Sequence, residues 1–147
     1  MAAAIAPILI ALASFVLRLV NLGSTKGYIF DEVYYVDGAR DLLKYGVEVS
    51  GSNPEFIVHP PVGKWLIGAG IAIFGDNEFG WRFATALIGT LLILVFARLV
   101  HVLFYSPLLT ALGAALMALD GLLLVHSRTA LLDLFLTFFI LDRKSVV

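Results

Sequence analysis

Two adjacent carboxylates, Asp31 and Glu32, follow a few residues after an apolar segment that is long enough to cross a membrane. Charged side chains close to lipid are costly unless they have partners or a function. A carboxylate in such a place can act as a general base and take the proton of an incoming hydroxyl group. Asp31 could equally be the N-cap of the helix that follows, and Glu32 could simply pair with a cation. The chemistry therefore depends on which other polar residues reach the same place.

The other candidate residues are those that could bind a phosphate group or support the two carboxylates. Arginine is suited to phosphate because its planar guanidinium matches the anion in a bidentate manner. Each candidate also has a purely structural interpretation, as a headgroup anchor, a turn residue, an ion-pair partner or a snorkelling cation. These candidates are Arg18, His59, Lys64, Arg82, Asp120, Arg128 and Asp133.

The elements that must position these residues are predicted to be membrane helices. The 147-residue chain is 61% hydrophobic and 14% charged, with a mean hydropathy of +0.98. Soluble domains are about 45–50% apolar and about 25% charged. The net charge of −1 gives no electrostatic basis for binding nucleic acid, and the absence of Cys excludes disulfides and thiolate chemistry. The composition predicts an all-α, polytopic integral membrane protein.

Four membrane spans are predicted from the apolar runs, because about 20 apolar residues are needed to cross a bilayer. The first run could instead be a signal peptide, since Ala11-Leu12-Ala13 is typical of a cleavage site, but no basic segment precedes it. The last run stops abruptly before residues 142–147. We interpret this tail as non-native and the chain as the front part of a longer protein; the alternative is a natural charged flank. The predicted spans are residues 1–22, 83–105, 108–125 and, as the start of a fourth, 129–141.

Residues 23–80 are predicted to form an external loop that contains two helices at the membrane surface. Residues 32–45 carry apolar and charged side chains on opposite faces at helical spacing, and Gly46 is a stop signal. Residues 61–75 begin with a Pro pair and are too short for a typical span, which favours an interfacial or re-entrant helix. If this segment does not cross the bilayer, Arg82 and the later polar residues meet Asp31 at one membrane face. If it crosses, Arg82 lies on the opposite face.

Four motifs follow one another along the chain: Phe30-Asp31-Glu32-Val33, His59-Pro60-Pro61-Val62-Gly63-Lys64, Trp81-Arg82-Phe83 and Arg128-Thr129-Ala130-Leu131-Leu132-Asp133. In their order and rough spacing they resemble the N-terminal region of the protein O-mannosyltransferases. These are dolichyl- or polyprenyl-phosphate-mannose–protein mannosyltransferases with the GT-C fold. The resemblance extends over residues 5–141, and the acidic pair combined with the His-Pro-Pro block is its most specific part.

The resemblance implies an inverting transfer of mannose from polyprenyl-phosphate-mannose to Ser or Thr hydroxyls of acceptor proteins. Asp31 would be the catalytic base, and Glu32 would position the acceptor or the base. Arg82 would contact the lipid phosphate. The further residues that the resemblance assigns to binding the substrate or the lipid phosphate are His59, Lys64, Arg128 and Arg18, with Asp133 and Asp120 as supporting residues.

The resemblance also implies a multi-pass protein of the bacterial plasma membrane, with the catalytic loop on the extracytoplasmic side. Its partners would be polyprenyl-phosphate-mannose, the bilayer and acceptor proteins during secretion. Neither a metal ion nor another cofactor is expected. The chain by itself is expected to be inactive, because the later helices of the family are absent.

Three alternatives remain beside this interpretation. A sister GT-C enzyme would move another lipid-linked sugar, such as aminoarabinose, onto lipid A, although Gly63-Lys64 favours the mannosyltransferases. A transporter subunit would use Asp120, Arg128 and Asp133 as an intramembrane relay, but these residues lie towards the ends of their spans. A non-catalytic scaffold would make Asp31→Asn silent.

Overall fold

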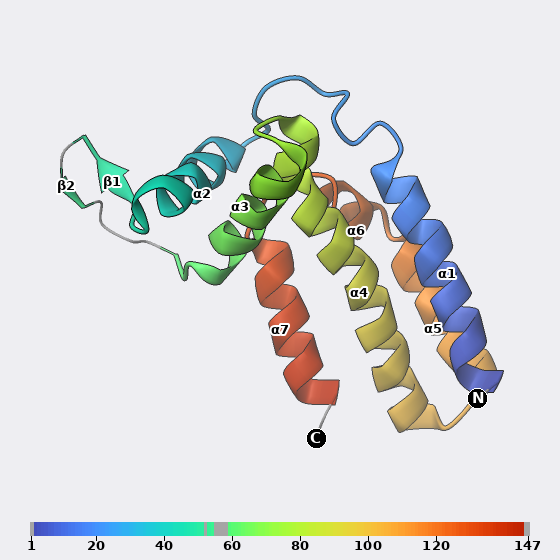
Figure 1. Ribbon diagram of the computed structural model, residues 1–147. Helices are drawn as coiled ribbons and strands as arrows, with labels where there is room; N and C mark the ends of the chain where they lie inside the picture. The colour runs from blue at the N-terminus through green and yellow to red at the C-terminus, as the bar shows by residue number, and fades with distance from the viewer. Residues whose placement is uncertain (1, 52, 55–58, 146–147) are drawn as a thin grey trace.

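The computed structural model describes residues 2–51, 53–54 and 59–145, and this part of the chain is mostly helical. Figure 1 shows four helices running side by side: α1 (Ala2–Leu19), α4 (Glu78–Phe104), α5 (Pro107–Leu119) and α7 (Asp133–Ser145). Helix α4 packs against the other three, and α5 also packs against α1. The N-terminus, the α4–α5 turn and the C-terminal end lie at one end of this bundle.

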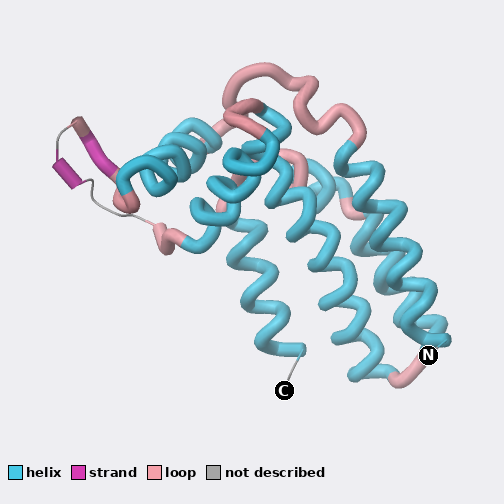
Figure 2. The backbone as a smooth tube through the Cα atoms, viewed as in Figure 1, coloured by secondary structure: helices cyan, strands magenta, loops and turns pink. Residues whose placement is uncertain are grey.

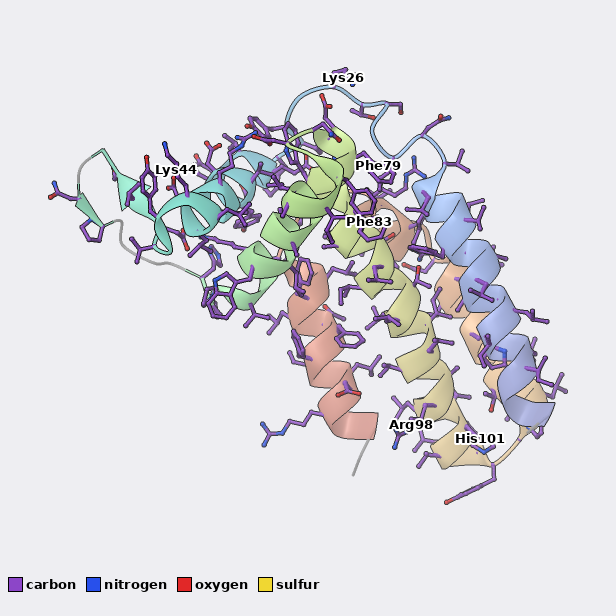
Figure 3. The ribbon with its side chains drawn as sticks, viewed as in Figure 1. Lys26, Lys44, Phe79, Phe83, Arg98 and His101 are labelled. Carbon is purple, nitrogen blue, oxygen red and sulfur yellow. The ribbon has the colours of Figure 1, made fainter. Side chains whose placement is uncertain are left out.

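The polar loop lies at the other end of the bundle. It contains α2 (Glu32–Tyr45), a short antiparallel pair of strands, β1 (Val49–Ser50) and β2 (Asn53–Pro54), and α3 (Val62–Phe74). Figure 2 shows that the two strands project away from the helices. The labelled side chains of Figure 3 distinguish the two ends, since Lys26 lies at the loop end of the molecule and Arg98 and His101 lie at the far end of α4.

Helix α2 has the bounds that the helical spacing over residues 32–45 predicts. Its apolar face, with Tyr35, Val36 and Ala39, is buried, and α2 packs on α3. Gly46 ends the helix in the left-handed conformation, at φ 75°. The periodicity therefore located this helix correctly, because the apolar stripe is the face that the helix buries.

Helix α3 does not carry the chain to the far end of the bundle. It lies across the loop end, and the chain turns at Gly75 into α4, whose first N–H groups are capped by Asn77. The two helices meet closely: a Cβ on Gly70 would lie 2.3 Å from the backbone oxygen of Gly80. Arg82, near the start of α4, consequently lies at the same end of the bundle as Asp31, which is the arrangement that the candidate site requires.

The segment predicted as one helix over residues 108–125 is two helices, which corrects that prediction. Helix α5 ends at Leu119, and α6 (Gly121–His126) begins after Asp120 in extended conformation. The Asp120 carboxylate accepts a hydrogen bond from Leu123 N at 2.6 Å. Aspartate side chains compete for backbone N–H groups in this way, so they favour helix starts over helix interiors.

The last helix, α7, runs from Asp133 to Ser145 and so includes residues 142–145 of the segment that we interpreted as a tail. Residues 146–147 lie outside the described part of the chain.

Helix α4, with 27 residues, is the one described helix that is long and apolar enough to cross a membrane, and the apolar helices α1, α3 and α5 are shorter. Large apolar side chains on the outer faces of α1 and α5 are exposed. They include Leu9, Leu12, Val16, Leu108, Leu112 and Leu116. Such rows are unusual on a monomeric soluble protein, because exposed apolar patches are normally covered by a partner or by lipid.

Candidate active site

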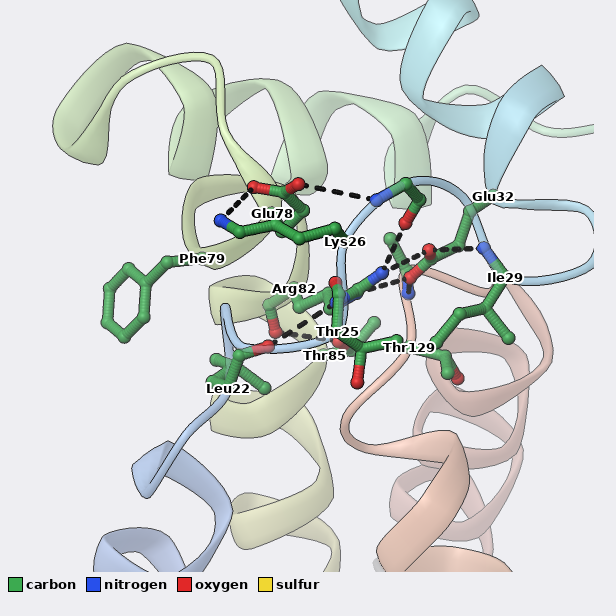
Figure 4. A network of polar contacts seen from close by, with 12 residues as sticks. Leu22, Thr25, Lys26, Ile29, Glu32, Glu78, Phe79, Arg82, Thr85 and Thr129 are labelled. Carbon is green, nitrogen blue, oxygen red and sulfur yellow. Dashed lines mark hydrogen bonds and ion pairs between the residues drawn. The ribbon is translucent and has the colours of Figure 1, made fainter.

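Glu32 and Arg82 form a buried ion pair at the loop end of α4 (Figure 4). Arg82 Nε donates to Glu32 Oε1 and Arg82 Nη2 donates to Glu32 Oε2, both at 2.8 Å. The side chain of Arg82 is 1% exposed and that of Glu32 is 0% exposed. A bidentate pair of this kind is the geometry in which guanidinium and carboxylate interact most strongly.

The remaining N–H groups of Arg82 are also used. Nη1 donates to the carbonyl oxygens of Leu22 at 3.4 Å and Thr25 at 2.9 Å, and Nη2 donates to that of Gly27 at 2.9 Å. Since a guanidinium has five N–H groups, none is left for a phosphate in this arrangement. The geometry therefore does not support the expected contact of Arg82 with the lipid phosphate. It gives Arg82 the role of holding the loop after α1 against α4.

Glu32 makes two further contacts with parts of the chain that are far apart in sequence. Its carboxylate accepts hydrogen bonds from Ile29 N at 2.8 Å and from Ala130 N, in the α6–α7 turn, at 2.7 Å. The side chain is completely buried. Glu32 therefore connects the first loop, α4 and the α6–α7 turn, and both of its carboxylate oxygens are engaged in these contacts.

Asp31 is placed differently from its neighbour. It occupies the N-cap position of α2, as predicted, but its side chain makes no capping hydrogen bond. The residue is half-buried and lines a pocket of about 680 Å³. Phe30, directly before it, has φ 53° and an 80% exposed ring. A left-handed backbone at a bulky residue is strained, and the surrounding structure must impose it.

The pocket brings Asp31 together with two other residues predicted from the sequence, His59 and Lys64. It also includes Tyr35, whose ring lies 5.4 Å from that of His59 in an edge-to-face arrangement. Burial raises the pKa of the Tyr35 phenol, and the nearby carboxylates of Asp31 and Asp133 raise it further. The phenol therefore stays protonated, and it can donate a hydrogen bond beside the Asp31 carboxylate.

Lys64 neither snorkels nor remains free, because it donates a hydrogen bond to Glu48, a residue that sequence reasoning had not singled out. Both side chains are about 95% buried. Lys64 needs a counterion because it lies in the first turn of α3, where the helix dipole makes a positive charge unfavourable. The unfavourable position of Lys64 is the sequence signal that could have led to a search for an acidic partner.

A second network that sequence reasoning missed attaches α2 to the α3–α4 corner. Arg40 donates from Nε and Nη2 to the two carboxylate oxygens of Asp76, each at 2.8 Å. Trp81 Nε1 donates to the same carboxylate at 2.6 Å, and the Arg40 guanidinium lies over the Trp81 ring. The hydrogen bond from Arg40 and, to a smaller extent, that from Trp81 hold the pKa of Asp76 below its usual value. The hydrogen bond to Asp76 also raises the pKa of Arg40.

The two remaining arginines among the predicted site residues, Arg18 and Arg128, lie on the α1 side of the molecule and do not line the pocket of Asp31. Arg18 is fully buried and donates from Nε to Ser127 Oγ at 2.8 Å. Arg128 is half-buried and donates to the carbonyl oxygens of Leu17 at 3.0 Å and Arg18 at 3.3 Å. Arg128 therefore caps the last turn of α1, where a cation also complements the helix dipole.

The two supporting aspartates do not line the pocket of Asp31, although the Asp133 carboxylate is near enough to raise the pKa of Tyr35. Asp120 caps α6, and Asp133 is exposed in the first turn of α7. Both line a second, mostly apolar hollow of about 270 Å³, together with Leu92 and Met117. Among residues 2–51, 53–54 and 59–145, no group of three His, Asp or Glu side chains is arranged to hold a metal ion.

Comparison with known proteins gives a consistent set of relatives. The family model described as dolichyl-phosphate-mannose-protein mannosyltransferase matches residues 58–141. A polyprenol-phosphate-mannose–protein mannosyltransferase of Mycobacterium tuberculosis (strain ATCC 25618 / H37Rv) is 47% identical over 138 residues, which is 90% of this chain and 26% of that protein. The protein of the same name in Corynebacterium glutamicum is 37% identical over 90% of this chain and 27% of its own length.

A more distant relative bears another name. The undecaprenyl phosphate-alpha-4-amino-4-deoxy-L-arabinose arabinosyl transferase 2 of Pseudomonas fluorescens is 36% identical over 91 residues, 60% of this chain and 17% of that protein. No solved structure matches the chain. The chain spans about a quarter of the length of the curated mannosyltransferases it matches.

Proposed function

Because the chain belongs to the dolichyl-phosphate-mannose-protein mannosyltransferase family, we propose that it carries the acceptor-activating part of an enzyme that moves mannose from polyprenyl-phosphate-mannose to a Ser or Thr hydroxyl of a protein. The observation that carries the proposal is the contrast between the two adjacent carboxylates. Glu32 is completely buried and bonded to Arg82, whereas Asp31 faces an open pocket without a capping bond.

In the proposed reaction, Asp31 takes the proton of the acceptor hydroxyl as that oxygen attacks C1 of the mannose. The bond between C1 and the phosphate oxygen breaks, and its electron pair leaves with the polyprenyl phosphate. One displacement inverts the configuration at C1, so one base suffices on the acceptor side. A positioned general base typically contributes about 10²–10⁴-fold to such a rate.

The leaving phosphate needs positive charge near it, since electrostatic stabilisation of developing charge is a large part of catalysis. Arg82 has its five N–H groups engaged. We therefore assign this role to Arg128, which is half-buried and uses Nη1 for its contacts with α1. It lies two residues before Ala130, whose N–H binds Glu32. We expect Arg128→Gln to lower kcat at saturating lipid donor, and an unchanged kcat would contradict the assignment.

The same proposal includes a multi-pass arrangement, with α1, α4, α5 and α7 in the bilayer and the loop end at the extracytoplasmic surface. It is supported by the length and apolar composition of α4 and by the exposed apolar rows on α1 and α5. Labelling of single cysteines introduced at Lys26 and Tyr105 from the two sides of intact cells tests it, because these residues lie at opposite ends of α4.

The activity is tested in a chimera in which this chain replaces the matching segment of the M. tuberculosis relative. Membranes with the chimera receive polyprenyl-phosphate-mannose and a Thr-containing peptide. We expect transfer by the parent and a loss of at least about 100-fold with Asp31→Asn. Glu78→Gln is the control, because it converts an acid to an amide at the same end of the molecule and away from the pocket.

The similarity to the P. fluorescens arabinosyl transferase supports one alternative, a transferase of another lipid-linked sugar. The same membranes supplied with undecaprenyl-phosphate-aminoarabinose and lipid A distinguish the two. Transfer of aminoarabinose without transfer of mannose would replace the proposal.

A further inference from the structure

Glu48 has one carboxylate oxygen engaged and one without a partner. Oε2 accepts the hydrogen bond from Lys64, whereas Oε1 is buried and has no hydrogen-bond partner among the described residues. The residue is 5% exposed and lines the pocket beside Asp31. A buried acceptor without a donor costs free energy, so this oxygen is suited to receive an N–H or O–H group from a molecule in the pocket.

The position of the pair is determined by Gly38 on α2. A Cβ at Gly38 would lie 2.9 Å from Glu48 Oε2 and 3.2 Å from Lys64 Nζ. Any side chain at this position would displace the pair, and the glycine therefore lets Glu48 and Lys64 approach the wall of α2. Oε1 of Glu48 is accordingly held next to the middle of that helix.

The charge of the pocket indicates which substrate it takes. Four carboxylates line it, those of Asp31, Asp37, Asp41 and Glu48, against the two cations Arg40 and Lys64. Both cations are committed, Arg40 to Asp37 and Asp76 and Lys64 to Glu48. The excess of negative charge disfavours the phosphate of the lipid donor. Peptide N–H groups and lysine or arginine side chains are favoured.

We propose that this pocket selects acceptor polypeptides by charge, and that Glu48 is the specificity-determining residue, binding an N–H or a cationic side chain of the segment next to the modified hydroxyl. The proposal rests on the proposed function, since it assigns Asp31 and Glu48 to the same acceptor. Gly38 lies seven positions after Asp31, which corresponds to about 10 Å along the helix. An extended peptide covers this distance in about three residues. The selected position is therefore about three residues from the Ser or Thr.

The test uses the chimera described above and a series of peptides with one Thr. Each peptide carries Lys, Ala or Glu three residues before or three residues after the Thr. We expect kcat/KM to fall from Lys to Ala to Glu on one side of the Thr, with about tenfold between Lys and Glu, equivalent to about 1.4 kcal/mol. Substitution on the other side should have little effect.

Two variants connect this selectivity to Glu48. Glu48→Gln keeps the shape but leaves Lys64 buried without a counterion, and this variant can fail to fold. The double variant Glu48→Gln/Lys64→Met removes one negative and one positive charge and retains the volume of the pair. The net charge of the pocket is therefore unchanged, and a loss of selectivity in this variant is assigned to Glu48 itself rather than to the overall charge. We expect the double variant to accept the three peptides within about twofold of one another. Glu78→Gln, which breaks the exposed Lys26–Glu78 pair outside the pocket, is the matched control and should keep the selectivity.

A binding measurement separates failure of this inference from failure of the proposed function. The chain in nanodiscs is titrated with the same peptides, labelled with a fluorophore, without any lipid donor. Equal affinity for the Lys and Glu peptides, or transfer rates that ignore charge, would overturn the inference. Charge-selective binding that is lost in the double variant, without mannose transfer by the chimera, would support the inference and refute the mannosyltransferase proposal.

Discussion

Arg82 and Glu32, 50 positions apart in the sequence, meet in a bidentate ion pair whose two donor–acceptor distances are both 2.8 Å. The carboxylate also accepts Ala130 N, so one buried group joins the first loop, α4 and the α6–α7 turn. Asp31 directly precedes Glu32 in the chain, and its position beside the pocket is therefore determined by this pair.

Removing one partner of the pair should destabilise the protein, because the other charge would remain buried. We expect Arg82→Met to lower the free energy of unfolding by about 3–5 kcal/mol. The double variant Glu32→Gln/Arg82→Met should recover part of this loss. Denaturant unfolding in detergent, followed by Trp fluorescence, measures both. A variant Arg82→Met with normal stability and a raised KM for the lipid donor would instead assign Arg82 to the phosphate.

The role of Asp120 at the break between α5 and α6 can be tested by comparing the stabilities of two variants. Asp120→Ala removes the acceptor for Leu123 N and should cost about 1 kcal/mol, whereas Asp120→Asn keeps a good N-cap and should cost only a few tenths. Unfolding of both variants under the same conditions checks this. Equal losses would mean that the charge of Asp120, and not its capping bond, is what matters.

The Arg40–Asp76 network predicts a dependence of stability on pH. The pKa of Asp76 is lowered in the folded protein, so its contribution is present above the unfolded value of about 3.9 and is lost as the pH falls through the lower folded value. We expect the free energy of unfolding to decrease below about pH 4. Asp76→Asn should reduce this part of the slope. An unchanged slope in Asp76→Asn would contradict the expectation.

Gly38 should be intolerant of a side chain although it lies inside a helix. Alanine favours helices over glycine by about 1 kcal/mol, but a Cβ at Gly38 would crowd Glu48 and Lys64. We therefore expect Gly38→Ala to destabilise the protein. Gly121→Ala in α6 is the control, because nothing lies within 4 Å of its Cβ position, and it should be neutral or stabilising. Thermal unfolding of the two variants compares them directly.

Mannose transfer by the chimera is expected to be independent of added metal. In the proposed reaction, Asp31 acts on the acceptor hydroxyl as a base, and no step requires a metal ion. We expect the initial rate to be unchanged when EDTA is added in excess over the protein and any trace metal, because a chelator inactivates an enzyme only when it removes a metal that the enzyme needs. Loss of activity with EDTA and its recovery with Mg²⁺ or Mn²⁺ would contradict this.

The sequence by itself located most of the local elements and, through the resemblance to a known family, indicated Asp31 as the candidate base. The apolar spacing of residues 32–45 located α2, because a helix on the surface of a packed structure must bury one stripe of its side chains. The short length of the Pro-initiated segment indicated that α3 would not cross, and the structure returns the chain to the same end of the bundle. The break at Asp120 was missed, because the apolar run around it outweighed one capping residue.

The tertiary structure alone decided which charged residues are partners and which one remains available. Arg82 and Glu32 are distant in sequence, as are Lys64 and Glu48, and no local pattern specifies such pairs. Burial makes each pairing obligatory, because an unpaired charge away from water is far more costly than a paired one. That requirement engages Arg82 with Glu32 and the first loop, and it leaves Asp31 facing the pocket.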